Sequence, residues 1–405
     1  VGYSLQVNKA GITDTVTISV NGTPDPNISI DWGDSLSSNA SDFTGSVISH
    51  TYSSLSDNDT RGISVLGESE FLVDFEGALT LTSWGTTPWY SGEYLAKFVV
   101  SIDTFSETDT PTFKDTGVVK FGHSTMFNVY GASPDVTNWD VSNVTDDSDG
   151  FKGGGRFNRA TSGWNVSKGT SFSNMFLQCF VFNQDISGWN VSNGTDFSDM
   201  FRQCYVFNAN IGSWDMSNAT TLRAMFSSAS VFNQPLNNWD VSNVPDLQAT
   251  FASAKAFNQP LNLWNTSNVT NMYATFSSYP AAFNQDISSW DTSNVTRMTN
   301  MFSWNPVFNQ PLNSWDVSSV QDFYGMFGGY SSSISSAFNQ PLNLWNTSAA
   351  TRMANMFRRN AVFNQNIRMW DVTNVQDFTN MFSEATAMEE EQEADATPTP
   401  DYFEE

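Results

Sequence analysis

The sequence predicts an N-terminal β-sandwich followed by a right-handed solenoid of about ten 25-residue coils. The main observation is a set of ten tryptophans that recur every 25 or 26 residues, with a single step of 30. A period of this length is typical of a solenoid, in which each unit packs mainly on its neighbours. The first 75 or so residues lack this period. The tryptophans are Trp139, Trp164, Trp189, Trp214, Trp239, Trp264, Trp290, Trp315, Trp345 and Trp370.

These two observations divide the chain of 405 residues into four parts. We expect a sandwich over residues 1–75, degenerate capping coils over 76–125, the repeat solenoid over 126–385 and an acidic tail over 386–405. The part at 76–125 contains Trp84-Gly85 and Trp89 but not the full repeat, as expected of coils that close the end of a stack.

The first part has the alternation of a β-structure. Val16, Ile18 and Val20 are separated by polar residues, which is the two-residue period of a strand. The run Asp31-Trp32-Gly33-Asp34, followed by His50-Thr51-Tyr52, resembles the signature of PKD (polycystic kidney disease) domains, although Ser35 stands where that signature usually has Gly. The resemblance implies a β-sandwich of the kind found in cell-surface proteins, which acts as a spacer or an interaction module.

The repeat itself has two segments. Phe232–Val244 is rich in aromatic, β-branched and turn residues, so we expect an extended stretch that stacks in parallel on the next coil. After it, apolar residues such as Val269, Met272 and Phe276 fall three to four apart, which is the spacing of a short helical turn. Short parallel strands combined with short helical turns indicate a leucine-rich-repeat-like coil.

The full unit reads Phe-Asn-Gln-Pro-Leu-x-x-Trp-Asp-Val-Ser-Asn-Val-Thr-x-Met-x-x-Met-Phe. It resembles the BspA-like repeat of bacterial surface proteins over about two thirds of the chain. The resemblance implies a surface lipoprotein or adhesin-like protein, and similar arrays occur in viral proteins. It supplies no catalytic residues. The chain shows neither a lipobox nor a wall-anchor motif, which distinguishes it from cellular members.

Polar residues recur with the same period. An Asn follows the Phe of each unit, as in Asn233 and Asn258, and a structural role is expected because buried polar groups must be hydrogen-bonded. Asp or Asn follows each Trp. Carboxylates on neighbouring coils, such as Asp215 with Asp240 or Asp291 with Asp316, could share a calcium ion, although the exchange of Asp for Asn argues against a role that needs a carboxylate. No other cofactor is expected.

Cys179 and Cys204 are the only cysteines and occupy the same position in adjacent units. Stacked Cα atoms about 5 Å apart fall within the range that a disulfide allows. The alternative is a small buried residue, since Ala229 and Ala254 occupy this position elsewhere. We keep the disulfide as a possibility.

Composition restricts the partners. The formal net charge of −25 disfavours nucleic acid and anionic membrane surfaces, because phosphate binding needs clustered cations. The sequence has no run of 18 apolar residues, so no membrane insertion is expected. The acidic tail reads as a solvated linker or a docking segment, in which Tyr402 and Phe403 could contact a neighbouring subunit and support self-assembly.

An enzyme is not expected, because His50, His123 and the two cysteines are scattered over separate elements. The favoured function is a non-catalytic, surface-exposed protein that binds a glycan or protein on a cell or particle. The alternative is a structural component of a virion or surface assembly, such as a phage decoration or fibre protein or a surface layer. Both imply an extracellular, cell-surface or virion-surface location.

One unit departs from the pattern. It gains five residues within 328–336, and insertions into coils often form the binding face. We expect partner contacts there, at Tyr330 and Ile334, and just beyond it at Arg358 and Arg359.

Overall fold

The computed structural model describes residues 2–8, 15–20, 26, 29–32, 36–45, 47–51, 60–66, 71–75, 78–83, 102–105, 136–137, 141–142, 144–329, 334–391 and 394–403. The chain divides into two compact units, Val1–Asn193 (unit 1) and Gly194–Glu405 (unit 2).

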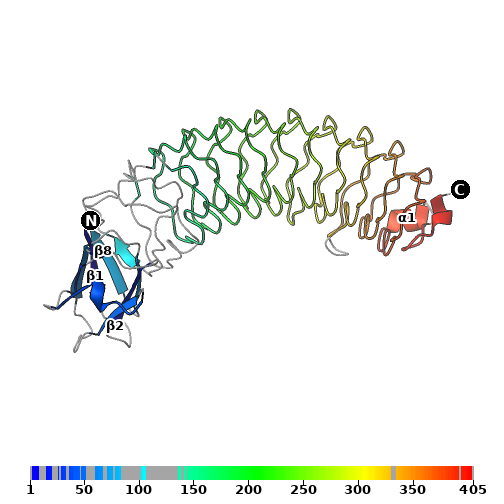
Figure 1. The fold of residues 1–405 in the computed structure, drawn as a ribbon. Coiled ribbons are helices and arrows are strands. Elements are labelled where there is room, and N and C mark those ends of the chain that lie inside the picture. The colour runs from blue at the N-terminus through cyan, green and yellow to red at the C-terminus, as the bar shows by residue number, and fades with distance from the viewer. Residues whose placement is uncertain are drawn as a thin grey trace. The chain divides into compact units, whose positions relative to one another are not determined.

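Unit 1 begins with two β-sheets (Figure 1). The larger sheet has the strand order β4-β3-β6-β1-β8-β9, and the smaller one has the order β5-β2-β7. Neighbouring strands are antiparallel, except for β8 and β9. The strands are β1 (Gly2–Asn8), β2 (Thr15–Val20), β3 (Ser29–Asp31), β4 (Ser37–Asn39), β5 (Val47–Thr51), β6 (Thr60–Leu66), β7 (Phe71–Phe75), β8 (Ala78–Ser83) and β9 (Ile102–Phe105), with a 3-10 turn η1 (Ala40–Asp42) after β4.

Two residues of the Asp-Trp-Gly-Asp and His-Thr-Tyr motifs join these sheets. Trp32, which follows β3, is buried, and its indole stacks on His50 of β5 at 4.8 Å between ring centroids. The Trp32 Nε1–H also donates to Ser38 Oγ at 2.9 Å. Gly33, Asp34 and Tyr52 lie outside the described residues, and the PKD-like resemblance stays a prediction.

The sheet region extends further along the chain than predicted. β8 and β9 lie within residues 76–125, where capping coils were expected, and β8 pairs with β1 in register from Leu5–Leu81 to Asn8–Ala78. The physical reason is the alternation of Leu79 and Leu81 with threonines, which suits a strand that continues the first sheet. Trp84, Trp89 and His123 lie outside the described residues.

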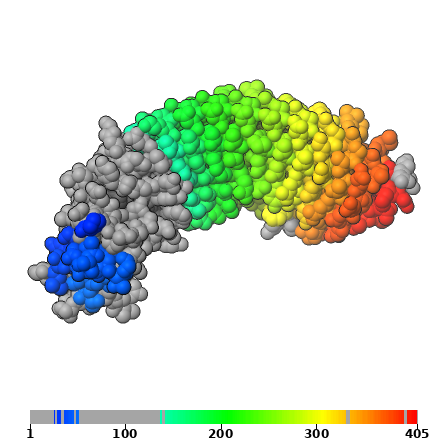
Figure 2. All heavy atoms as spheres, viewed as in Figure 1, coloured from blue at the N-terminus to red at the C-terminus, as the bar shows by residue number. Residues whose placement is uncertain are grey.

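The repeats form stacked coils, where one coil runs from one of the period-marking tryptophans to the residue before the next. Each is named here by its tryptophan. Figure 1 shows successive turns of chain in unit 2, and Figure 2 shows their atoms packed directly against one another. Backbone hydrogen bonds join each coil to the next, for example Ala249 N to the Tyr273 carbonyl at 2.7 Å and Phe251 N to the Thr275 carbonyl at 3.0 Å.

The recurring tryptophans from Trp164 to Trp370 are buried in the coils, as the sequence predicts. Trp239 and Trp264 are 2% and 3% exposed. The indole N–H of each donates to a backbone carbonyl 28 residues earlier: Trp239 to Ile211 at 3.1 Å and Trp264 to Leu236 at 2.9 Å. Each of these two tryptophans therefore fills the core and ties its turn of chain to the turn about one period earlier.

The local structure of the repeat differs from the expected strand and helical turn. Single parallel bridges replace strands, and they lie in the segment expected to be helical, as with Asn271, which bridges both Asp246 and Arg297. Here the backbone N–H groups alternate between the next coil and a turn of their own coil. Ala249 N bonds the next coil, whereas Ala252 N bonds the Ala249 carbonyl at 3.0 Å. This alternation requires a positive φ of 54° at Ala249, which a helix excludes.

The repeated asparagines link the coils. Asn233 Oδ1 accepts a hydrogen bond from Asn258 N at 2.9 Å, and Asn258 Oδ1 accepts one from Asn284 N at 2.9 Å. Gln285 Nε2 donates to the same oxygen of Asn258 at 3.0 Å. The predicted structural role of this position is confirmed by these bonds.

The acidic tail packs on its own chain, which corrects the expectation of a solvated segment. It contains α1 (Thr386–Glu391) and the 3-10 turn η2 (Pro400–Phe403). Phe403 is buried and stacks on Phe378 at 5.7 Å, while Tyr402 lies edge-on to Phe382 at 5.9 Å. Two aromatic side chains gain burial by folding back over the last coil, so docking on another subunit would require them to leave these contacts.

The part of the chain that the structure describes contains no helix long and apolar enough to cross a bilayer.

Candidate binding slot

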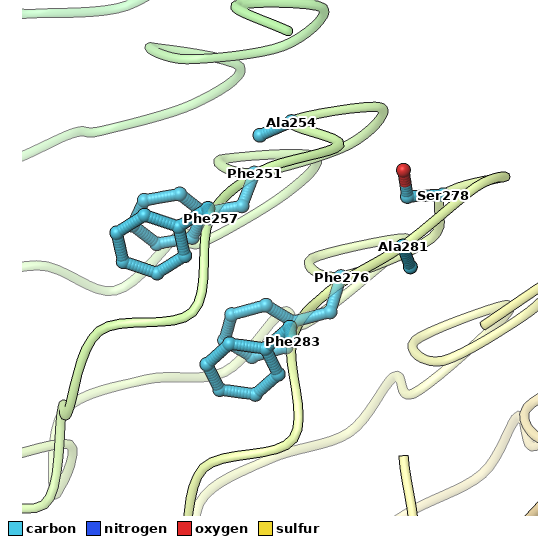
Figure 3. Close-up of a pocket in the computed structure, with 7 residues that line it drawn as sticks. All are labelled: Phe251, Ala254, Phe257, Phe276, Ser278, Ala281 and Phe283. Carbon is cyan, nitrogen blue, oxygen red and sulfur yellow. The ribbon is translucent and has the colours of Figure 1, made fainter. Parts of the chain in front are cut away.

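One hollow of unit 2 is part of the closed core. It is lined by Phe251, Phe257, Phe276 and Phe283, with Ala254, Ser278 and Ala281 above the rings (Figure 3). The phenyl rings pair within each coil at 4.0 and 3.8 Å between centroids. The hollow has no room for a water molecule, so we exclude it as a ligand site.

A second hollow of unit 2 opens at the surface and has a volume of about 290 Å³. We call it the slot. This volume lies near the lower end of the range of roughly 300–1,000 Å³ that small-molecule sites occupy. It spans three consecutive coils, those of Trp290, Trp315 and Trp345. Its lining residues are Asn300, Ser303, Trp304, Tyr324, Gly325, Gly328, Gly329, Asn355, Arg358 and Arg359.

The middle coil has glycine at three positions that line the slot. At the position of Gly325 the other coils carry Ala, Asp or Asn, and at the position of Gly328 they carry larger residues such as Ser303 and Arg358. A Cβ on Gly325 would lie 2.3 Å from Asn300 Oδ1, and a Cβ on Gly329 would lie 2.5 Å from the Arg359 carbonyl oxygen. The neighbouring coils therefore approach these two glycines so closely that a side chain has no room there, whereas at Gly328 the nearest atom to an added Cβ is 3.3 Å away.

Backbone hydrogen bonds hold the walls of the slot in place. Trp304 N donates to the Gly328 carbonyl at 2.8 Å, and Gly329 N donates to the Arg358 carbonyl at 2.7 Å. The three coils are therefore fixed at the spacing of a hydrogen-bonded ladder. A site on such a scaffold is formed before a ligand arrives, which reduces the entropic cost of binding.

Aromatic and cationic side chains lie among the slot residues and next to them. Trp304 is 47% exposed, which is unusual for the largest apolar side chain. Tyr324 supports the guanidinium of Arg352, whose Cζ lies 4.0 Å from the ring centroid. Arg352 is also 3.5 Å from Asp377, and Arg359 Nε is 3.0 Å from Glu384 Oε1. Both of these arginines are thus neutralised locally.

Two buried polar atoms of the slot residues have no hydrogen-bond partner. They are Asn355 Oδ1, an acceptor, and Arg358 Nε, a donor. An unsatisfied buried group of this kind costs ~1–3 kcal/mol. Among the described residues, Arg358 also forms no ion pair with a carboxylate. The slot therefore has an arginine without a carboxylate partner on its Trp345-coil side.

Comparison with protein families gives four matches to one family, described as Mycoplasma protein of unknown function, DUF285. They cover residues 122–237, 195–280, 220–336 and 332–399, which together are more than half of the chain. The chain belongs to the DUF285 family. The overlapping matches also show that it is a repeat protein. Comparison with curated proteins and with solved structures finds no match.

Two of the predicted contact residues in this DUF285 chain, Arg358 and Arg359, line the slot. Ile334 is half-buried, and its carbonyl lies beside Gly329, 3.0 Å from where a Cβ would stand. Tyr330 lies outside the described residues. Trp304, Asn355 and the other lining residues were missed by sequence reasoning. A comparison of equivalent positions in the coils could have found them, because only the Trp315 coil has glycine at all three of the positions of Gly325, Gly328 and Gly329.

The exposed Asp and Asn residues after the tryptophans of the DUF285 repeat accept hydrogen bonds from within their own coil. Asp215 Oδ1 accepts from Ser217 N at 3.0 Å, and hydrogen bonds from Ser217 lower the pKa of Asp215. Asn265 makes the same turn with Ser267 N at 3.2 Å. Among the described residues, three or more His, Cys, Asp or Glu side chains nowhere cluster as metal ligands would. The possible calcium site between neighbouring aspartates stays a prediction.

Both cysteines of this DUF285 chain are buried. Cys179 Sγ lies 3.0 Å from the Phe151 carbonyl oxygen, which is the geometry of a thiol that donates a hydrogen bond. The disulfide with Cys204 stays a prediction, and intact-mass measurement with and without reductant tests it.

A buried carboxyl group lies in unit 1, away from the slot residues in sequence. Asp147 is fully buried at a position where other coils carry Phe, Leu or Met, and neither of its carboxylate oxygens has a partner. Burial, with a contribution from the neighbouring Asp146, raises the pKa of Asp147 well above its usual value. The group therefore holds its proton in the folded state beyond the usual range.

Proposed function

We propose that this chain is a non-catalytic binding protein that works outside the cell or on a particle surface. In this proposal the coils form a rigid solenoid, and the slot binds a glycan. The repeated residues stabilise the stacking of the coils, and the partner contacts lie where the sequence of a coil departs from the repeat.

The observation that supports this proposal is the composition of the slot walls. An exposed indole, a set of amide and hydroxyl side chains and two arginines surround a hollow of about 290 Å³. A sugar ring has an apolar face of C–H groups that packs on an aromatic ring, and its hydroxyl groups both donate and accept hydrogen bonds. Trp304 suits the first requirement, and Asn300, Ser303 and Asn355 suit the second.

The absence of catalysis is part of the proposal. The slot has no carboxylate, histidine or cysteine among its lining residues. Glycoside hydrolysis usually requires a pair of carboxylates flanking the bond that breaks. Binding without turnover is therefore the reaction class that these side chains favour.

A glycan microarray probed with the full chain tests the proposal. The informative variant is Trp304→Ser, because Ser228 and Ser253 occupy the equivalent position with φ of 64° and 57°, close to the 65° of Trp304. The control is Leu344→Ala, which removes an apolar side chain that is 71% exposed outside the slot.

We expect binding to at least one glycan class, a loss of about tenfold or more in Trp304→Ser, and no change in Leu344→Ala. If no glycan is bound, or if both variants behave as the wild type, the proposed function is wrong.

A further inference from the structure

The charged residues around the slot indicate the charge of its ligand. The chain has a formal net charge of −25, yet a cation without a carboxylate partner among the described residues lines the slot. This cation is Arg358. The neighbouring Arg352 and Arg359 are paired with Asp377 and Glu384, whereas Arg358 has no carboxylate partner among the described residues.

From this arrangement we infer that the slot takes a sugar residue that carries a carboxylate, such as a uronic or sialic acid. The inference rests on the proposed function and specifies its ligand class. The carboxylate accepts hydrogen bonds from the Arg358 guanidinium, and the sugar ring packs against Trp304.

The hydrogen-bonding groups favour one carboxylate over a more highly charged ligand. A guanidinium presents paired N–H groups that match the two oxygens of a carboxylate. Arg358 has no carboxylate partner among the described residues, so a carboxylate on the ligand can pair with its guanidinium. Phosphate-rich polymers need several free cations, and this slot offers a single one.

The polar side chains of the slot fit the sugar itself. Asn300, Ser303 and Asn355 line the slot with amide and hydroxyl groups. Sugar hydroxyl groups both donate and accept hydrogen bonds, so they can pair with amide and hydroxyl side chains of either kind. A ligand that has a carboxylate and hydroxyls on one ring therefore suits both the guanidinium of Arg358 and these polar side chains.

The size of the slot suits a single sugar residue. Its volume of about 290 Å³ is at the small end for ligand sites. A terminal or side-branch sugar of a glycan presents such a single residue.

Biolayer interferometry with immobilised oligosaccharides tests the inference. The three probes are a glycan that ends in N-acetylneuraminic acid, one that ends in glucuronic acid, and a neutral glycan that ends in galactose. The full chain is measured as the wild type and as Arg358→Gln. The matched control is Arg202→Gln, since Arg202 occupies the equivalent position of the Trp189 coil and pairs with Asp199 at 2.9 Å.

We expect one or both acidic glycans to bind at least about tenfold more tightly than the neutral one, since a charge-assisted hydrogen bond is lost with the neutral probe. Arg358→Gln should abolish this preference, and Arg202→Gln should keep it. A second variant, Gly328→Ser, fills the slot with the residue that Ser303 supplies at the equivalent position, and should weaken all binding while circular dichroism stays unchanged.

The outcomes separate the two proposals. If the neutral glycan binds as tightly as the acidic ones and Trp304→Ser abolishes that binding, the slot is a glycan site without acidic specificity and this inference is wrong. If acidic glycans bind but Arg358→Gln has no effect, the carboxylate lies elsewhere and the inference is also wrong. If none of the three probes binds and the microarray is negative as well, the proposed function fails with it.

Discussion

Replacement of Trp239 tests how the coils are held together. Its side chain is 2% exposed, its Nε1–H donates to the Ile211 carbonyl at 3.1 Å, and its ring lies 6.2 Å from that of Phe226. The Ile211 carbonyl also accepts a hydrogen bond from Trp214 N at 3.1 Å, so it keeps one partner when the indole is removed. Trp239→Ala leaves a cavity, for which we expect a loss of about 3–5 kcal/mol in the free energy of unfolding. Trp239→Phe keeps most of the ring volume and removes the indole hydrogen bond, so we expect a loss of about 0.5–1.5 kcal/mol.

Urea unfolding followed by far-UV circular dichroism measures both losses, and the signal does not depend on the tryptophan that is removed. The control is Leu263→Ala, directly before Trp264, where the side chain is 64% exposed and a change within about 0.5 kcal/mol is expected. If Trp239→Ala and Leu263→Ala shift the midpoint equally, the tryptophans do not hold the coils and the reasoning is refuted.

Three further predictions follow from buried or repeated polar groups. Because burial raises the pKa of Asp147, its contribution to stability is complete below about pH 4 and falls as the pH rises toward the raised pKa. Asp147→Leu should remove this fall in stability. If the urea midpoint changes by the same amount between pH 4 and about pH 8 in the wild type and in the variant, the prediction is contradicted. Asn258→Ala leaves Asn284 N–H unpaired and should lower the free energy of unfolding by about 1–3 kcal/mol, measured by urea unfolding. Asn258→Asp keeps the acceptor oxygen and should lose less. An equal loss of stability in both variants would show that the amide group itself is needed. Asp215→Asn should change stability by less than about 0.5 kcal/mol at neutral pH, because Asn265 makes the same turn. The lowered pKa of Asp215 means that its contribution to stability is lost as the pH falls through that pKa, and Asp215→Asn should reduce this loss. An unchanged midpoint of acid unfolding in the variant would contradict the prediction.

The positions that repeat could be predicted from the sequence. A tryptophan every 25 residues, the Phe-Asn pair and the Met-Phe pair recur because each fills the same place in every coil, and burial of Trp239 and the Asn258 ladder follow from that. The backbone of the turn segment could not be predicted in the same way. Its N–H groups donate either to a carbonyl of their own coil or to one of the next coil, and the spacing of apolar residues does not indicate which.

The slot was predictable only in part. The insertion at 328–336 and the arginines after it pointed to the correct region of the chain. The slot itself is lined by Gly325, Gly328 and Gly329, and by an exposed Trp304 in the preceding coil. Whether the neighbouring coils fill the space beside a glycine or leave it open depends on the coil register, which the sequence alone does not supply.

Hydrogen–deuterium exchange tests the central claim most directly, namely that the partner contacts lie in the slot and not on the regular coils. The full chain is compared with and without the tightest-binding glycan of the microarray. We expect slowed exchange in residues 300–304, 324–329 and 355–359, with the coils of Trp214, Trp239 and Trp264 unchanged. Slowed exchange spread evenly over the regular coils, with none at the slot, would contradict the account.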